Sequence, residues 1–267
     1  MSEANDWQIP VSGAELYETM FVPTISAVWA PKVIALAQPQ LGERILDVAC
    51  GTGALTRLIP ALVGPRGRVV GLDLNSAVLD VARSRAIHQA SAAQIEWHEG
   101  DASALPFADE TFDVVYCELG LMFFPDRIAA LKEMHRVLRP NGRLALMTWG
   151  AIDKCPAQTV MKNMWGRFGA DKAAFFDAQH ALSDPEVVLR LIRDSGFNDA
   201  SVQTVMGVIR FDSPELLTRI WGTALGIQTD APTRAQIIAE VSAALQAYVG
   251  AQGLVYPIEA VLSSARK

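Results

Sequence analysis

Short apolar runs alternate with segments of helical periodicity through the first 150 residues. Five runs rich in Val, Ile, Leu and aromatic residues predict strands at 44–49, 68–73, 94–100, 112–118 and 142–149. Between them, apolar residues that recur three and four positions apart predict helices at 53–63, 75–90 and 126–138. Strands that alternate with helices are typical of a parallel sheet covered by helices on both faces. The pattern therefore predicts an α/β fold with a doubly wound sheet.

The pattern changes after Trp149, where helical segments become longer and strands rarer. In chain order, we predict helices in 151–182 and 183–197, a strand at 200–211, two helices within 212–252 and a strand at 253–264. Pro257 lies inside the last strand and indicates a sheet edge or a bend. We therefore expect residues 1–150 to form a ligand-binding core that begins with a helical segment. Residues 151–267 are expected to add two strands, with 151–182 and 212–252 as helical insertions that cap the sheet.

The composition sets limits on the class of protein. Apolar residues make up 51% of the 267 residues, enough for a sizeable core. A net charge of −6 disfavours a nucleic-acid partner, which requires clustered lysines and arginines. No membrane-spanning run and no leader-like N-terminus are visible, so a cytoplasmic protein is expected. Three scattered cysteines, Cys50, Cys117 and Cys155, predict neither a disulfide framework nor a metal site.

The stretch "ILDVACGTGAL", residues 45–55, is the first candidate for ligand chemistry. The apolar run stops at Asp47, and glycines follow at positions 51 and 53. A glycine adopts positive φ and has no Cβ, which allows close approach to the main chain. In a doubly wound sheet, this first turn after a strand is the usual ligand contact. The third glycine of a dinucleotide fingerprint would fall at Thr56, so NAD is a weaker candidate.

Acidic residues follow three consecutive predicted strands. Asp73 comes twenty residues after Gly53, a position suited to accepting hydrogen bonds from ribose hydroxyls. Asp101 follows the third strand, and Asp47 lies at the glycine turn. Each acid alone would more often be a helix cap or a solvated loop residue. Their ordered spacing favours a nucleoside with a cationic tail and no phosphate, which describes S-adenosylmethionine.

Five motifs occur in order across residues 44–149: "ILDVACGTG", "VVGLDLN", "EGDASALPF", "FDVVYCELGLMFFPD" and "MHRVLRPNGRLAL". In these motifs the sequence resembles the class I S-adenosylmethionine-dependent methyltransferases, and among them the ubiquinone/menaquinone-biosynthesis type. The resemblance implies a seven-stranded, mostly parallel Rossmann-like sheet with an antiparallel edge strand and a helical cap. It extends upstream to "LYETMFVP", which is similar to an N-terminal segment that closes over the cofactor. It is faint after Trp149, where substrate selection is expected.

The resemblance implies a role for ten residues in binding S-adenosylmethionine. The methionine end would be lined by Tyr17, Asp47, Ala49, Gly51, Gly53 and Cys117. Asp73 would bind the ribose hydroxyls, and Leu74 would flank the adenine. Asp101 would accept a hydrogen bond from the adenine amino group, while the backbone N–H of Ala102 would meet a ring nitrogen. No metal is expected.

Methyl transfer is an in-line displacement that depends mainly on alignment and exclusion of water, so a base is optional. His180 lies in the predicted cap and is the first candidate for a base; Glu118 is the second. Glu118 has alternative roles as a loop carboxylate or as a ligand to the cofactor amine. Apolar substrate contacts are predicted from aromatic residues that also suit an ordinary core, namely Phe123, Phe124, Trp149 and Phe175.

We therefore predict a methyltransferase that acts on an O, N or C atom of a small, largely apolar molecule such as a quinone precursor, polyketide, phenol or amine. One alternative is an enzyme that uses the same cofactor without methyl transfer, for example in cyclisation or decarboxylation. A regulatory protein without turnover and a NAD-dependent oxidoreductase are the others. The segment 117–120 lacks the Asn/Asp-Pro-Pro-aromatic motif of adenine-N6 methyltransferases, which also disfavours nucleic acid. Apolar cap helices are compatible with a homodimer.

Overall fold

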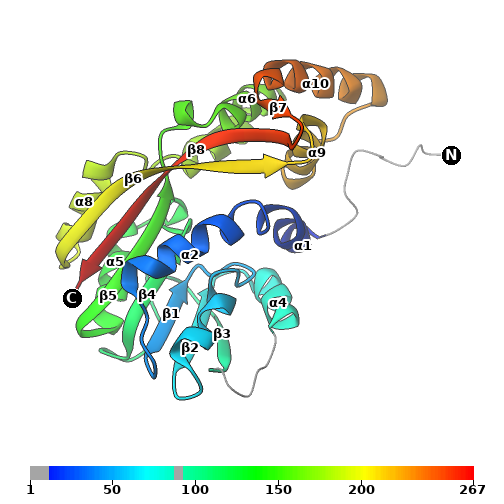
Figure 1. Ribbon diagram of the computed structural model, residues 1–267. Helices are drawn as coiled ribbons and strands as arrows, with labels where there is room; N and C mark the ends of the chain where they lie inside the picture. Colours follow the sequence, from blue (N-terminus) through cyan, green and yellow to red (C-terminus); the bar gives the residue numbers. More distant parts are fainter. Residues whose placement is uncertain (1–11, 87–92) are drawn as a thin grey trace.

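The computed structural model describes residues 12–86 and 93–267. Its centre is one mixed sheet with the strand order β3-β2-β1-β4-β5-β8-β6 (Figure 1). The strands are β1 Arg44–Val48, β2 Arg68–Asp73, β3 Ile95–Glu99, β4 Phe112–Glu118, β5 Leu138–Trp149, β6 Asn198–Phe211 and β8 Gly253–Arg266. A two-residue strand, β7 Val249–Gly250, pairs only with the start of β8. The predicted fold class is confirmed.

Strands β1 to β5 pair in parallel, so their carboxyl ends lie along one edge. The antiparallel strand is β8, which lies between β5 and the outermost strand β6. Pairing with β5 ends at Ala260, and Pro257 faces only Val208 of β6. Proline lacks a backbone N–H and is tolerated where one side of a strand is unpaired. Pro257 therefore does mark a local edge.

Helices cover the sheet on both sides, with α2 in front of it and α5 behind it in Figure 1. The α-helices are α1 Gly13–Leu16, α2 Ser26–Ala37, α3 Pro60–Val63, α4 Ser76–Arg85, α5 Arg127–Val137, α6 Pro156–Trp165, α7 Ala170–Gln179, α8 Pro185–Asp194, α9 Pro214–Ala224 and α10 Ala231–Ala244. Many begin at a side chain that accepts a backbone N–H, for example Asn75 before α4 and Asp126 before α5. Such caps fix where the chain leaves each strand end.

Two predicted helices differ from those observed. The predicted helix 53–63 is a turn, a short 3₁₀ segment Thr56–Leu58 and the one-turn helix α3. Pro60 explains the break, because it has no N–H to donate within a helix but is well suited to start one. The predicted helix 75–90 is observed as α4, and its residues 87–90 lie outside the described residues.

The segment after α5 also departs from the prediction. Strand β5 begins at Leu138, directly after the helix, and not at position 142. Leu138 pairs with Phe112 of β4, and the register then shifts before Arg143 pairs with Val114. The chain makes this irregular start at Pro140 and at Asn141, whose φ is +64°. Asparagine adopts positive φ more readily than most residues, which allows the turn without a glycine.

The predicted cap helices lie together. Helices α6, α9 and α10 contact one another, and α7 contacts α6. Figure 1 shows α6, α9 and α10 at the end of the long β6–β8 pair that extends past the shorter strands. Within the described ranges, no single helix combines the length and the apolar composition needed to cross a membrane; the bent pair Gly13–Phe21 and Ser26–Ala37, at 79°, meets both criteria jointly.

Candidate active site

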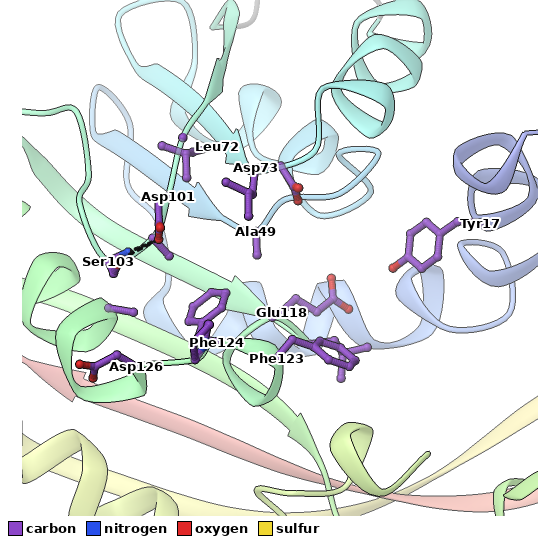
Figure 2. Close-up of a pocket in the computed structure, with 17 residues that line it drawn as sticks. Tyr17, Ala49, Leu72, Asp73, Asp101, Ser103, Glu118, Phe123, Phe124 and Asp126 are labelled. Atoms are coloured by element: carbon purple, nitrogen blue, oxygen red, sulfur yellow. Dashed lines mark hydrogen bonds between the residues drawn. The ribbon is translucent and has the colours of Figure 1, made fainter. Parts of the chain in front are cut away.

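A cavity of about 510 Å³ opens at the carboxyl ends of the parallel strands (Figure 2). This volume is within the usual range for small-molecule sites. Six of the ten predicted cofactor residues line it: Tyr17, Ala49, Asp73, Leu74, Asp101 and Ala102. Glu118, one of the two predicted catalytic residues, lines it as well. The cavity therefore gathers residues from the ends of four strands, β1 to β4, and from the N-terminal segment.

Asp73 and Asp101 are held in place by backbone N–H groups. One Asp73 carboxylate oxygen accepts the N–H of Gly51 at 2.8 Å, and the other accepts the N–H of Asn75 at 2.9 Å. Asp101 Oδ1 accepts the N–H and the hydroxyl of Ser103, both at 2.8 Å, and these bonds lower the Asp101 pKa. A carboxylate oxygen can accept more than one hydrogen bond. Both side chains therefore remain able to accept hydrogen bonds from a ribose or an adenine.

The glycine turn supports the cavity without lining it. Gly51 has φ +56° and uses its N–H to hold Asp73. Gly53 has φ +80°, and a Cβ there would come within 2.3 Å of the Trp97 ring. The close approach inferred from these glycines is thus made, at Gly53, by an indole from β3. Ala49 does line the cavity and has φ +56°, an unusual backbone conformation for a residue with a Cβ.

Asp47 lies beneath the turn, with 1% of its surface exposed. It lines a second, much smaller cavity that also includes Tyr17, Ala49 and Glu118. The hydroxyl of Thr56 donates to Asp47 Oδ2 at 2.6 Å, so the residue that replaces the third fingerprint glycine has a specific role. Oδ1 has no partner among the described residues. Burial raises the Asp47 pKa to about 7; the Thr56 hydrogen bond opposes this rise, and the charge of Asp73 adds to it.

Tyr17 and Glu118 face each other across the cavity (Figure 2). Tyr17 starts the π-helical turn Tyr17–Phe21, and such turns occur frequently at functional sites. Desolvation of the hydroxyl raises the Tyr17 pKa to about 12, although 36% of the residue's surface is exposed, and the charge of Glu118 contributes. Burial raises the Glu118 pKa well above its usual range, with a smaller contribution from Asp47. Glu118 Oε1 is buried and has no partner in the part of the chain that the structure describes.

The N-terminal segment is fastened to the glycine turn by Glu18. Its carboxylate accepts the Thr52 hydroxyl at 2.5 Å and pairs with the Arg57 guanidinium at 2.7 Å. Arg57 in turn donates to the Thr52 carbonyl. The ion pair is largely shielded, with 20% and 10% of the Arg57 and Glu18 side chains exposed. This contact holds Tyr17 over the cavity.

The structure does not bring Cys117 or His180 to either cavity. Cys117 is fully buried on the other side of β4 from Glu118, because side chains alternate along a strand. His180 is also buried, and its Nδ1 lies 2.7 Å from the carbonyl oxygen of Gly150. Burial lowers the His180 pKa. The roles assigned to these two residues from the sequence remain predictions without support from cavity geometry.

Aromatic residues form the apolar wall. Phe123 and Phe124 line the cavity, as predicted. The Phe123 ring stacks on the ring of Phe175 in α7, with centroids 6.2 Å apart. The Phe175 ring in turn packs edge-on against Trp221 of α9, with centroids 5.9 Å apart. Trp149 is instead a core residue, packed edge-on against Trp29. The cap helices therefore contribute aromatic side chains beside the cavity mouth.

Several lining residues were not identified from the sequence, namely Leu72, Gly100, Ser103, Leu119, Gly120, Pro125, Asp126 and Ala130. A signal exists for some of them. Ser103 follows Asp101 at the spacing of a side-chain-capped turn, and the loop 119–126 directly follows a strand whose end was already a candidate site. The remaining contacts depend on how this loop folds back, which local sequence does not determine.

Comparison with known proteins identifies the family. Residues 15–210 match the model of the ubiE/COQ5 methyltransferase family. The chain belongs to this family. S-adenosylmethionine is therefore the methyl donor, and the resemblance seen in the sequence is confirmed. The NAD alternative is set aside.

Individual relatives support membership of the ubiE/COQ5 family. The chain is 32% identical over 192 residues to the ubiquinone/menaquinone biosynthesis C-methyltransferase UbiE of Coxiella burnetii, covering 68% of this chain and 77% of that protein. It is 45% identical over 120 residues to a 2-phytyl-1,4-naphtoquinone methyltransferase of Thermosynechococcus vestitus, covering 45% of this chain and 52% of that protein. The chain thus spans about half the length of several curated relatives that it matches.

A solved structure of a Bacillus halodurans protein described as a methyltransferase shares the fold of this ubiE/COQ5 family member. The TM-score is 0.60 at 23% identity, covering 89% of this chain and 98% of the other. The residues present also fit S-adenosylmethionine. Asp73 and Asp101 offer acceptors for a nucleoside, while Asp47 and Glu118 hold buried carboxyl oxygens that lack partners in the described ranges.

Proposed function

We propose that the protein transfers a methyl group from S-adenosylmethionine to a ring carbon of a quinone precursor. The observation that carries this proposal is one cavity lined by Asp73 and Asp101 and also by Phe123 and Phe124, in a chain of the ubiE/COQ5 family. Two relatives support the choice of acceptor, because their names specify methylation of a naphthoquinone and C-methylation in quinone biosynthesis.

Bound S-adenosylmethionine supplies a methyl group on a positively charged sulfur. The chain contributes alignment and exclusion of water. Asp73 and Asp101 fix the nucleoside, so the methyl group has a defined direction. Tyr17 covers the cavity from the N-terminal segment, and Phe123 and Phe124 provide a flat apolar surface for an aromatic ring. Such a surface suits a planar acceptor better than a flexible polar one.

A reduced quinone carries phenolic hydroxyl groups, and loss of a hydroxyl proton makes the adjacent ring carbons more nucleophilic. A base at the cavity would assist this step. Of the two predicted bases, Glu118 lines the cavity and His180 does not. The base role of Glu118 therefore has geometric support, whereas that of His180 has none.

The acceptor is tested with the full chain, methyl-¹³C-labelled S-adenosylmethionine and three acceptors of similar size: a reduced demethylated naphthoquinone, a phenol whose ring carbons are blocked, and an aromatic amine. We expect a labelled methyl on carbon of the naphthoquinone, identified by NMR, together with S-adenosylhomocysteine. An Asp73→Ala sample serves as the matched control for the cofactor site. Methylation on oxygen or nitrogen only would contradict the proposal. Binding without any methylated product would favour the non-methylating alternative.

A further inference from the structure

Two aromatic side chains are exposed at the mouth of the large cavity. Phe123 lines the cavity and has 47% of its surface exposed, and Phe175 of α7 is 36% exposed (Figure 2 labels Phe123). Single exposed apolar residues are normal on a protein surface. These two come from segments far apart in the sequence and pack against each other. A paired arrangement beside a cavity indicates an apolar surface that is part of the site.

The two rings do not cover each other completely. Their planes differ by 24° and their centroids lie 6.2 Å apart. Rings in full face-to-face contact would have centroids about 3.5–4.0 Å apart, the optimal separation of carbon atoms. Each ring therefore keeps area that the other leaves uncovered. Phe123 belongs to the cavity wall and Phe175 does not, so together they form an aromatic surface that begins inside the cavity and continues past its mouth.

The outer ring, Phe175, packs against a tryptophan of another cap helix. Trp221 of α9 is 5% exposed, and its ring centroid lies 5.9 Å from that of Phe175. The next residue, Phe176, is fully buried and packs against Phe175 at 5.7 Å and against Trp221 at 5.0 Å. Trp221 also contacts Phe21 of the N-terminal segment at 5.0 Å. Contacts with two buried rings restrict the Phe175 side chain, which is therefore fixed before a ligand binds.

The cofactor does not account for this surface. Its nucleoside is assigned to Asp73 and Asp101, and its methionine portion carries no ring. The methyl acceptor is the remaining ligand, and its ring must enter the same cavity, where Phe123 forms part of the wall. The Phe123–Phe175 pair is thus available to the acceptor.

The length of the acceptor decides how many of these rings it reaches. An acceptor with one ring can stack on Phe123 inside the cavity. A second fused ring extends further along the same surface and can contact Phe175 as well. Aromatic pairs favour offset stacking with centroids about 4.5–7 Å apart, and each such pair strengthens binding about two- to twelvefold beyond the effect of buried area. The second ring therefore gains affinity through Phe175.

We propose that Phe175 determines acceptor specificity: it extends the aromatic wall formed by Phe123, so that the site prefers an acceptor of two fused rings to one of a single ring. Trp221 is a positioning residue, because it contacts Phe175 and does not line the cavity. Only binding is involved, and no bond of the cofactor or the acceptor changes. The inference rests on the acceptor part of the proposed function, namely that a planar ring binds in the cavity, and not on which atom receives the methyl group.

The probes are naphthalene-1,4-diol and benzene-1,4-diol, which carry the same two hydroxyl groups and differ in the second ring. Their affinities for the full chain are measured by ligand-observed NMR titration in oxygen-free buffer, which keeps both diols reduced. Saturating S-adenosylhomocysteine fills the cofactor site without supplying a methyl group. We expect the wild type to bind the naphthalenediol about tenfold or more tightly than the benzenediol. Equal affinities, or no measurable binding of either diol, would overturn the proposal.

Variants assign this preference to residues. Phe175→Leu keeps an apolar side chain and removes the ring, so it should reduce the preference about fivefold and leave the affinity for benzenediol within about twofold. Phe175→Tyr keeps the ring and should retain the wild-type preference. Trp221→Leu should reduce the preference as Phe175→Leu does, and Trp221→Phe should restore part of it. Phe168→Leu is the matched control, since Phe168 is a partly buried cap aromatic that packs on Trp165 outside both cavities.

A wild-type preference in Phe175→Leu would refute the role of Phe175. If Trp221→Leu does not fold, Phe175→Leu decides, because Phe175 is partly exposed and its replacement leaves Trp221 and Phe176 in place. The titrations contain no methyl donor, so they are independent of the acceptor assay. Methylation on oxygen or nitrogen would contradict transfer to carbon and leave the ring preference intact. Loss of the preference alone would remove the role of Phe175 and leave transfer to carbon standing.

Discussion

Replacing Asp47 with asparagine should change how the stability of the free protein depends on pH. Asparagine has nearly the same shape and still accepts the hydroxyl of Thr56, which lies 2.6 Å from the carboxylate. It removes only the titratable proton. Because Asp47 is 1% exposed, solvent screens its charge very little. The comparison between wild type and Asp47→Asn therefore isolates the cost of charging a buried carboxyl group.

The magnitude follows from the pKa, which burial raises from 3.8 to about 7. The folded state holds this proton more tightly than the unfolded state, so the group contributes most stability below pH 3.8. That contribution is lost as the pH rises toward and through about 7. Between pH 5 and pH 9 the wild type should lose about 3 kcal/mol relative to Asp47→Asn, from two pH units at about 1.4 kcal/mol each.

Urea unfolding of both proteins at pH 5, 7 and 9, without cofactor, measures the difference. The free energy of unfolding of the wild type should fall relative to the variant as pH rises. Glu99→Gln is a matched control, since an exposed carboxyl group should give a difference that changes little with pH. A constant difference between wild type and Asp47→Asn across this range would refute the reasoning from burial.

Four further changes test other parts of the site. Asp73→Ala should weaken S-adenosylmethionine binding about 30-fold, since hydrogen bonds to a charged acceptor are lost; unchanged affinity by calorimetry would place the ribose elsewhere. Gly53→Ala should lower the free energy of unfolding by about 2 kcal/mol, because its Cβ would come within 2.3 Å of the Trp97 ring and its φ is +80°; urea unfolding at wild-type midpoint would contradict this. Glu18→Gln should accelerate amide hydrogen exchange in residues 13–21, since the contact that fastens this segment is weakened; unchanged exchange would mean that other contacts hold it. His180→Gln should leave turnover within about threefold and lower the melting temperature, because the side chain contacts the Gly150 carbonyl and not the cavity; a hundredfold loss of turnover would assign it to the reaction.

The cofactor acids were predictable because parallel strands place their carboxyl ends on one edge. The spacing of Asp73 and Asp101 after successive strands was therefore sufficient to bring both to one cavity. Which of the adjacent residues Cys117 and Glu118 lines the cavity could not be predicted from strand order alone. Adjacent residues of a strand point to opposite faces, and which face meets the cavity depends on the strand's register and neighbours. The sequence alone placed both residues at the site.

Contacts made by distant segments were not predictable from local pattern. Gly53 signals that something approaches the backbone, but only the folded sheet shows that Trp97 of β3 does so. His180 was predicted as a base because it lies in the segment expected to cap the substrate. In the structure it follows α7, and its side chain contacts the Gly150 carbonyl. The helix predicted at 53–63 is interrupted because Pro60 has no N–H to donate within a helix, whatever the apolar periodicity around it. Local chemistry located the site, whereas tertiary packing selected its residues.

A crystal structure of the complex with S-adenosylhomocysteine tests the proposed site most directly. We expect the ribose hydroxyls at Asp73, the adenine beside Asp101, and the amino group in the small cavity between Asp47 and Glu118. A nucleoside bound away from Asp73 and Asp101, or an amino group directed away from Asp47 and Glu118, would contradict the assignment.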